Sequence, residues 1–333
     1  MLNVGIIGLG VGEQHIYGYA LNKNCCVTSL CDIDQKKLAA VAFRHSIPRL
    51  TVNPIEILED PSIDVVSIAT YDDVHASQIL TALANGKHIF VEKPLCLTSE
   101  EFDQIYDAHL QRPDLCISSN LILRTAPRFI QLKDRISSNK LGEIYFLESS
   151  YDYGRIHKLI SGWRGDIPNY SVMHGGGIHL IDLFLWLTEF EVKTVTGVST
   201  KIATRNSNFK GPDAITANLE FSNGSIGVVT SNYPSVIPHG HRLALYGTNG
   251  TFHHGPLGAA YFWERDPKAH HELLSDEYPG TSKGAMIPSF IDHIIDRNSP
   301  SMVSEKDVFN AMSVSLAIEK SISTNSTVTV NHY

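Results

Sequence analysis

The sequence predicts an α/β domain with a parallel sheet, followed by an α+β domain with an open, largely antiparallel sheet. In the first third, short β-branched runs alternate with amphipathic stretches of helix length, which is typical of a parallel sheet with helices on both faces. Later strands are longer and are joined by turn pairs such as Asn223-Gly224. We therefore expect two domains, 1–120 and 121–333, as suits a chain of 333 residues.

Each element of the first domain follows from an apolar run or an amphipathic stretch. Helix starts are marked by Asp34 and by Thr98 or Ser99, residue types that cap helices. The expected strands are 3–7, 27–31, 65–69, 88–91 and 115–118, and the expected helices are 14–22, 35–44, 55–59, 76–85 and 99–111.

The second domain is expected to be a sheet with one exposed face, accompanied by helices. An uncovered sheet face that carries apolar residues predicts a homodimer or homotetramer. The expected strands are 143–153, 194–200, 214–221, 226–231 and 243–246, and the expected helices are 126–136, 177–188, 285–297 and 304–322.

Composition excludes several classes of partner and points to a cytoplasmic protein. A net charge of -8 without long acidic runs provides no basic field for nucleic acid or an anionic membrane. Five irregularly spaced cysteines indicate reduced thiols, and the first eight residues leave no room for a signal peptide. Export of a folded protein by a trimmed signal stays open. The pairs His253-His254 and His270-His271 lack nearby carboxylates, so we expect them to be solvated and expect no metal.

A glycine-rich turn joins the first strand to the first helix. Gly8, Gly10, Val11 and Gly12 lie where glycines allow the backbone to approach a pyrophosphate, which then faces a helix N-terminus. Glu13 stands where a third glycine is usual and must point away from the phosphates. The alternative is a tight turn that binds nothing.

Asp32 closes the second strand, at the separation where an acidic residue accepts hydrogen bonds from the adenosine ribose. Its carboxylate would repel a 2′-phosphate, so NAD is favoured over NADP. Lys36 and Lys37 lie just beyond and keep NADP open. The alternative is that Asp32 or Asp34 only caps the next helix.

Three further motifs together carry a family resemblance. They are the segment 67–75, the tripeptide Glu92-Lys93-Pro94, and the sequence Gly-Gly-Gly-Ile-His-Leu-Ile-Asp at 175–182. With them the chain resembles the glucose-fructose oxidoreductase and inositol dehydrogenase (Gfo/Idh/MocA) family over nearly its whole length. The resemblance implies a Rossmann domain and an NAD(P)-dependent oxidoreductase that acts on a CH–OH group of a sugar, cyclitol or nucleotide-sugar. The alternative is a non-catalytic sensor or repressor of the same fold.

The resemblance implies that Lys93 and His179 are catalytic and that Glu92 helps to hold the cofactor. An ammonium beside the cationic nicotinamide should lose proton affinity, which suits Lys93 to polarise a substrate hydroxyl. The alternatives are a surface Glu-Lys pair and a buried core histidine. Many relatives carry an aspartate four residues before this histidine, where this chain has Gly175, so the proton relay is expected to be shorter or to use another group.

The same resemblance assigns the remaining contacts. Tyr71 replaces a usual proline in the cofactor loop, which predicts a different loop shape. The resemblance also predicts a cis peptide before Pro94, and a surface salt bridge is the alternative for each arginine. Cofactor contacts are assigned to Thr70, His75, Glu92, Lys93, Asn120 and Arg164, and substrate contacts to Lys93, Arg124, Trp163 and His179.

Overall fold

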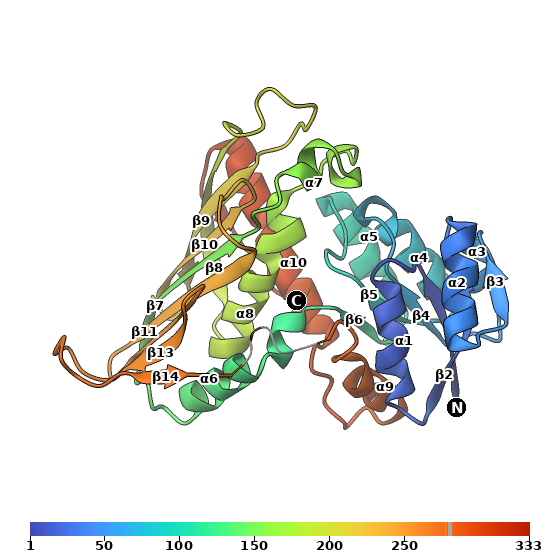
Figure 1. The fold of residues 1–333 in the computed structure, drawn as a ribbon, viewed down its shortest axis with the longest axis horizontal. Coiled ribbons are helices and arrows are strands. Elements are labelled where there is room, and N and C mark those ends of the chain that lie inside the picture. The colour runs from blue at the N-terminus through green and yellow to red at the C-terminus, as the bar shows by residue number, and fades with distance from the viewer. Residues whose placement is uncertain (277, 279–281) are drawn as a thin grey trace. The chain divides into compact units, whose positions relative to one another are not determined.

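The computed structural model describes residues 1–276, 278 and 282–333, and Figure 1 shows its ribbon. Helices and strands form two compact units, and the chain belongs to each of them in two segments. Within the described residues, no helix is both long enough and apolar enough to span a bilayer.

The first unit comprises Met1–Ile122 and Thr281–Phe309, and the second comprises Leu123–Gly280 and Asn310–Tyr333. The sequence predicts a single boundary near Asn120, with all later residues in one domain. The late segment groups with the first unit because its helix packs against early elements, a long-range contact that leaves no trace in local sequence patterns.

The first unit contains a six-stranded parallel sheet with the order β3-β2-β1-β4-β5-β6, which confirms the predicted parallel sheet. The short β3 was missed because its arginine and leucine are both exposed and form no apolar run. The strands are β1 (Leu2–Ile7), β2 (Cys25–Cys31), β3 (Arg49–Thr51), β4 (Val65–Ile68), β5 (His88–Val91) and β6 (Ile117–Ser119).

Helices of the first unit begin where the sequence provides caps. Asp34 accepts hydrogen bonds from the backbone amides of Lys36 and Lys37, and Thr98 forms a capping box with Glu101. The helices are α1 (Gly12–Ala20), α2 (Gln35–His45), α3 (Ile55–Leu58), α4 (His75–Ala84), α5 (Ser99–Leu110) and α9 (Ile287–Ile295), with a 3₁₀ turn η1 (Asp72–Val74).

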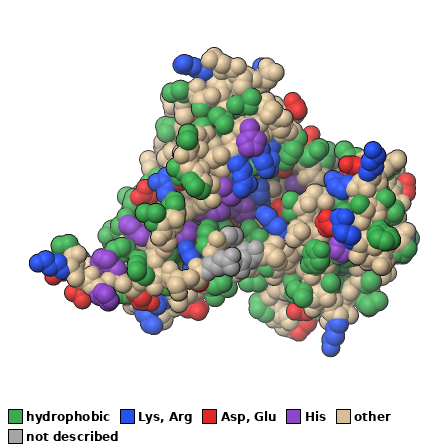
Figure 2. Space-filling view, viewed as in Figure 1, with side chains coloured by type: hydrophobic (Ala, Val, Ile, Leu, Met, Phe, Trp, Pro, Cys, Tyr) green, Lys and Arg blue, Asp and Glu red, His purple; other side chains and the backbone are tan. Residues whose placement is uncertain are grey.

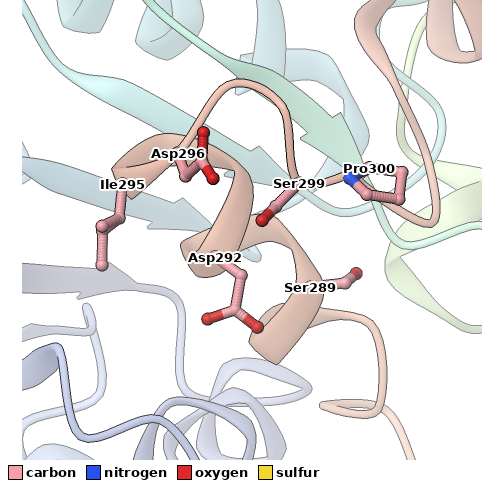
Figure 3. Close-up of a pocket in the computed structure, with 6 residues that line it drawn as sticks. All are labelled: Ser289, Asp292, Ile295, Asp296, Ser299 and Pro300. Carbon is pink, nitrogen blue, oxygen red and sulfur yellow. The ribbon is translucent and has the colours of Figure 1, made fainter.

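The late helix α9 packs on α1 and β5. The rings of Phe90 and Phe290 lie 5.7 Å apart, and the Asn22 amide donates to Asp292 at 2.7 Å. Helix α9 and the turn that follows it line a shallow pocket of about 370 Å³ (Figure 3). None of the candidate residues lines this pocket, so it carries no part of the predicted site.

The second unit contains a nine-stranded mixed sheet with the order β14-β13-β12-β11-β7-β10-β9-β8-β15. Among the strands that the structure describes, only β7 and β10 pair in parallel, which confirms the largely antiparallel prediction. The strands are β7 (Ile144–Asp152), β8 (Val192–Thr200), β9 (Ala214–Phe221), β10 (Ile226–Asn232), β11 (Gly240–Gly247), β12 (Thr251–Gly255), β13 (Gly258–Phe262), β14 (Glu272–Leu274) and β15 (Val328–Thr329).

Helices α6, α8 and the later part of α10 cover one face of this sheet (Figure 1). The alternation predicted for β9 puts Ala217, Leu219 and Phe221 into the core they share with these helices. The helices are α6 (Pro127–Ser137), α7 (His157–Ile160), α8 (Ile178–Thr188) and α10 (Glu305–Thr324), with the 3₁₀ turns η2 (Ile122–Thr125) and η3 (Trp163–Gly165) and the π-helical turn η4 (Met173–Gly177).

Candidate active site

The glycine loop of the first unit is tight on one side and open on the other. Gly8 has a φ of +87°, and a Cβ atom there would lie 2.3 Å from the Ala69 carbonyl oxygen, so only glycine fits. A Cβ on Gly10 would meet nothing within 4 Å, and Gly12 is the first residue of α1. Glu13 turns to Arg44, whose Nη2 lies 2.7 Å from its carboxylate. The loop therefore leaves backbone and a helix N-terminus accessible to an anion.

Asp32 fastens this loop to the end of β2. Its Oδ2 accepts a hydrogen bond from the Leu9 amide at 2.7 Å and lies 2.7 Å from Lys37 Nζ. Burial would raise the pKa of Asp32, but the bonds from Lys37 and two backbone amides lower it below its usual value. Asp34, not Asp32, caps α2, so the capping alternative applies to Asp34 alone.

Glu92 follows β5 and lies in a buried hydrogen-bond network. Its Oε1 accepts from Asn120 Nδ2 at 2.7 Å and from His15 Nε2 at 3.2 Å. Burial alone would raise the pKa of Glu92, but the His15 bond and the charges of Lys283 and Lys93 lower it to about 2. The carboxylate is therefore ionised and fixed directly before the cis Lys93–Pro94 peptide, whose predicted geometry is confirmed.

His15 is a member of this network that the sequence analysis missed. Its ring is fully buried, and its Nδ1 lies 2.9 Å from Ser67 Oγ. The side chain connects α1 with β4 and with the residue after β5, and no motif marks a histidine within a helix for such a role. The Asn120 Oδ1 atom is buried and has no hydrogen-bond partner among the described residues, so it can accept one further bond.

Thr70 and His75 lie in the segment after β4 that was predicted to contact the cofactor. The Thr70 hydroxyl donates to Gln78 Oε1 at 2.9 Å. His75 is fully buried, with its Nδ1 2.7 Å from the Pro94 carbonyl oxygen. Its ring therefore braces the segment against the Glu92-Lys93-Pro94 turn, and its predicted contact with cofactor stays a prediction.

His179 of the second unit lies in the first turn of α8, directly after the π-helical turn. It is 6% exposed, and its ring lies 6.5 Å from that of Tyr151 and 6.3 Å from that of His241. Turns of this kind often occur at functional sites. The Tyr151 ring is tilted to the imidazole and the His241 ring meets it edge-on, so His179 lies among aromatic side chains.

The space beside Gly175 is filled by two tyrosines that the sequence analysis did not identify. A Cβ at this position would lie 2.2 Å from Tyr170 Oη and 2.8 Å from Tyr233 Oη, and these hydroxyls are 3.1 Å apart. Both side chains are buried. The tyrosine hydroxyls thus take the volume that a larger side chain would occupy four residues before His179.

Arg124 and Asp182 form a buried ion pair within the second unit. Arg124 Nη2 lies 2.5 Å from Asp182 Oδ1, and its Nε lies 3.1 Å from both carboxylate oxygens. Both residues are at most 2% exposed. The surface salt bridge considered for Arg124 is therefore wrong, because the pair lies in the core, where it connects η2 with α8.

Trp163 and Arg164 form η3 and remain half-buried. The Arg164 guanidinium carbon lies 4.3 Å above the Trp163 ring, a cation–π contact, and the indole meets the Tyr170 ring edge-on at 6.3 Å. The indole thus reaches the same tyrosine that fills the space beside Gly175.

Two findings concern metals and histidines. Cys116, His293 and Glu305 place potential ligand atoms within 4.8 Å of one another. However, Arg297 Nη1 lies 3.3 Å from His293 Nε2 and 3.4 Å from Glu305, so a guanidinium already takes the place of a cation.

The expectation that His253 and His254 are both solvated is wrong for His254, which is 6% exposed because alternation along β12 turns it inward.

The first unit fits a dinucleotide. The open side of Gly10 gives backbone access at the N-terminus of α1, Asp32 offers an ionised carboxylate beyond it, and Asn120 has a buried acceptor to spare. These are the groups that a pyrophosphate, a ribose and a carboxamide require.

Comparison with known protein families supports dinucleotide binding by the first unit. Residues 2–118 match the family model described as the oxidoreductase family, NAD-binding Rossmann fold, so the first unit is an NAD-binding Rossmann domain. Residues 129–253 match the GFO/IDH/MocA C-terminal domain. The chain belongs to the GFO/IDH/MocA family of oxidoreductases.

Similar proteins include dehydrogenases of cyclitols. The scyllo-inositol 2-dehydrogenase (NAD(+)) of Bacillus subtilis is 30% identical over 65% of this chain and 62% of its own length. Inositol 2-dehydrogenase 2 of Saccharopolyspora erythraea is 26% identical over 59% of this chain and 56% of its own length. The matched regions thus cover less than two thirds of either relative.

Solved structures share the whole fold. Levoglucosan dehydrogenase in complex with NADH and levoglucosan superposes with a TM-score of 0.85 at 22% identity, covering 100% of both chains. The scyllo-inositol dehydrogenase of Lactobacillus casei with bound NAD(H) and scyllo-inositol gives a TM-score of 0.81 at 17% identity, covering 99% of both. At these identities the likeness establishes the fold.

Proposed function

We propose that this protein is an NAD(H)-dependent dehydrogenase or reductase that acts on a CH–OH or keto carbon of a sugar, cyclitol or nucleotide-sugar. The observation that carries this proposal is the buried, ionised Glu92, held by His15 and Asn120 directly before Lys93 in an NAD-binding domain. The named activities of the cyclitol and levoglucosan dehydrogenases support the substrate class.

In this proposal the first unit holds the cofactor. Gly8, Gly10, Val11 and Gly12 bind the pyrophosphate, and Asp32 binds the adenosine ribose, which favours NAD and leaves NADP as the weaker ligand. The bound nicotinamide supplies the hydride acceptor or donor. The remaining cofactor contacts are assigned to Thr70, His75, Glu92, Lys93, Asn120 and Arg164, and the substrate contacts to Lys93, Arg124, Trp163 and His179.

His179 and Lys93 share the proton chemistry. Oxidation of a carbinol releases a hydride from carbon and a proton from oxygen, and His179 accepts this proton as a neutral imidazole. Lys93 orients the hydroxyl and stabilises the negative charge that develops on oxygen. Burial, together with the neighbouring Tyr170, raises the pKa of Tyr233 well above its usual value. That phenol therefore stays protonated and positions neighbouring groups without accepting the proton.

The test is a substrate screen at the absorbance band of reduced nicotinamide, with inositols, hexoses and sugar acids at several pH values. Lys93→Met and His179→Asn should each lower kcat by about 10²-fold or more, with the Kd for NAD nearly unchanged. His253→Asn, on the exposed side of β12, is the matched control. Near-normal turnover of His179→Asn with the same pH profile would contradict the assignment. Stabilisation by ligands without any absorbance change would indicate a sensor.

The proposal also includes a cytoplasmic location and a homodimer or homotetramer. Tyr145, Val198 and Ile226 are exposed apolar side chains on strands of the second sheet, and a symmetry mate would bury them. Light scattering over a range of concentrations tests the assembly, and a monomer at every concentration would contradict it.

A further inference from the structure

The second unit contains a cavity of about 300 Å³ that no candidate residue lines. It is bounded by α6, the start of β11, β12 with the turn that follows it, and Tyr278. Its lining is rich in histidine, and Figure 2 shows histidine side chains, in purple, gathered near the centre of the view beside basic side chains. The polar residues that matter below are Arg128, His241, Arg242, His254 and Tyr278.

His254 presents a buried hydrogen-bond donor. Arg128 Nη1 donates to His254 Nδ1 at 2.9 Å, so Nδ1 is the acceptor nitrogen. Burial and the charge of Arg128 lower the pKa of His254 to about 4, so the neutral ring carries its proton on Nε2. This Nε2 is buried and has no hydrogen-bond partner among the described residues, a condition that costs stability unless a ligand or water oxygen accepts the bond.

The charges around the cavity are already balanced. Arg128 Nε lies 2.9 Å from an Asp276 carboxylate oxygen, and Arg242 Nε lies 2.6 Å from Asp152 Oδ2. A phosphate or carboxylate would meet two guanidinium groups whose charge is already neutralised, together with two carboxylates of its own sign. A neutral oxygen, from a hydroxyl or an ether, needs only the N–H of His254. The cavity therefore suits a hydroxyl-rich group without charge.

A chain of ring contacts connects the cavity with His179. The His179 ring lies 6.3 Å from that of His241, and the Tyr278 hydroxyl is 2.7 Å from His241 Nδ1. The ring of Tyr278 in turn lies 4.3 Å from that of His254. Two rings thus stand between His179 and His254, so a ligand group at His254 lies beyond the group that reacts at His179.

We propose that this cavity is a subsite for an uncharged, hydroxyl-rich substituent of the substrate, such as a second sugar ring, with His254 as its hydrogen-bond donor and specificity determinant. The inference rests on the proposed function only in placing the reacting carbinol at His179. Tyr278 and His241 line the cavity beside this donor, and aromatic side chains next to a hydrogen-bond donor are suited to a sugar ring, which combines apolar C–H faces with hydroxyl oxygens.

The first experiment measures binding, independently of turnover. Calorimetric titration of the NADH-loaded protein compares maltose, cellobiose, sucrose and trehalose with glucose and fructose. At least one disaccharide should bind about tenfold more tightly than its monosaccharides, and His254→Phe should remove this advantage by about three- to tenfold, the value of one neutral hydrogen bond. His254→Gln, which keeps a donor near the position of Nε2, should retain it.

Both variants lose the bond from Arg128 to Nδ1, so their difference isolates the Nε2 donor from any effect on folding. His253→Phe alters the neighbouring residue, which faces away and contacts Tyr246, and should leave every affinity unchanged. Binding that depends on His254 without any turnover would retain the subsite and reject the dehydrogenase. If monosaccharides are turned over but every variant binds disaccharides no more tightly than monosaccharides, the subsite alone is rejected. The absence of any sugar binding would reject both the subsite and the proposed dehydrogenase activity.

Discussion

The candidate residues of the two units are held in different ways. In the first unit, Asp32 and Glu92 end parallel strands and are fixed by hydrogen bonds from backbone amides and from two side chains. In the second unit, His179 lies among aromatic rings, and buried tyrosine hydroxyls fill the space beside Gly175. Strand ends are set by local sequence, whereas an aromatic pocket depends on side chains contributed from many parts of the chain.

The largest effect expected from this difference is at the buried ion pair of the second unit. Asp182→Leu leaves the Arg124 guanidinium in the core without its carboxylate, which should lower the free energy of unfolding by about 3–5 kcal/mol in urea denaturation. Glu220→Gln, which breaks the exposed pair with Lys193, should change it by less than about 1 kcal/mol. Equal effects would mean that Arg124 does not depend on this carboxylate.

The next largest effect compares one glycine from each unit. Gly175→Ala puts a methyl group against two buried tyrosine hydroxyls, and overpacking of this kind should cost about 1–3 kcal/mol of stability. Gly10→Ala, where a methyl group meets nothing within 4 Å, should cost little in the absence of cofactor. Thermal unfolding measures both. A Gly175→Ala protein of normal stability would show that Tyr170 and Tyr233 can move aside.

The dependence of stability on pH in the acid range tests the hydrogen-bond network around Glu92. Because its pKa in the folded protein is about 2, below the ordinary 4.5, its contribution to stability is complete above pH 4.5 and is lost as the pH falls toward 2. Between pH 5 and pH 3 the wild-type protein should lose on the order of 2 kcal/mol more stability than Glu92→Gln, as for a hydrogen-bonded buried charge. The exposed Glu100→Gln should follow the wild type. If the free energy of unfolding depends on pH in the same way for Glu92→Gln and for wild type, the ionised Glu92 does not stabilise the folded protein.

The smallest predicted effect concerns the choice between cofactors. Asp32→Asn should weaken NAD binding about tenfold and bring the Kd for NADP closer to that for NAD, because the carboxylate no longer repels a 2′-phosphate. Lys37→Gln should act in the opposite direction on NADP, since its ammonium lies beside Asp32. Fluorescence titration of the reduced cofactors measures both. An unchanged ratio of the two constants in Asp32→Asn would sink the assignment to the ribose.

The sequence was sufficient for most elements and for the residues at strand ends. The glycine turn and Asp32 could be identified because an apolar run followed by a glycine or an acid marks the end of a parallel strand, whereas Glu92 was identified through the family resemblance. Five strands were not predicted: β3, β12, β13, β14 and β15. Three of these, β3, β14 and β15, have only two or three residues and give no periodicity.

The second unit was less predictable because its pocket is assembled from distant positions. Tyr170 and Tyr233 are 63 residues apart, and nothing near either residue indicates that they meet beside Gly175. His254 was misjudged because two adjacent histidines look polar, although alternation along a strand buries one of them. Arg124 was predicted to contact substrate, with a surface salt bridge as the alternative, and only the fold shows that Asp182, 58 residues later, pairs with it in the core.

The return of α9 to the first unit bears on how the protein is made. A carbon added at Gly18 would lie 2.4 Å from the Gly284 carbonyl oxygen, and Asn22 bonds to Asp292. During synthesis these partners emerge only after the whole of the segment between the two halves of the first unit has been translated. Until then, the surface of α1 and the Phe90 ring of the nascent cofactor domain are not covered by α9. A recombinant cofactor domain should accordingly require residues 282–309 to be spliced onto 1–122, because a simple truncation leaves that surface bare.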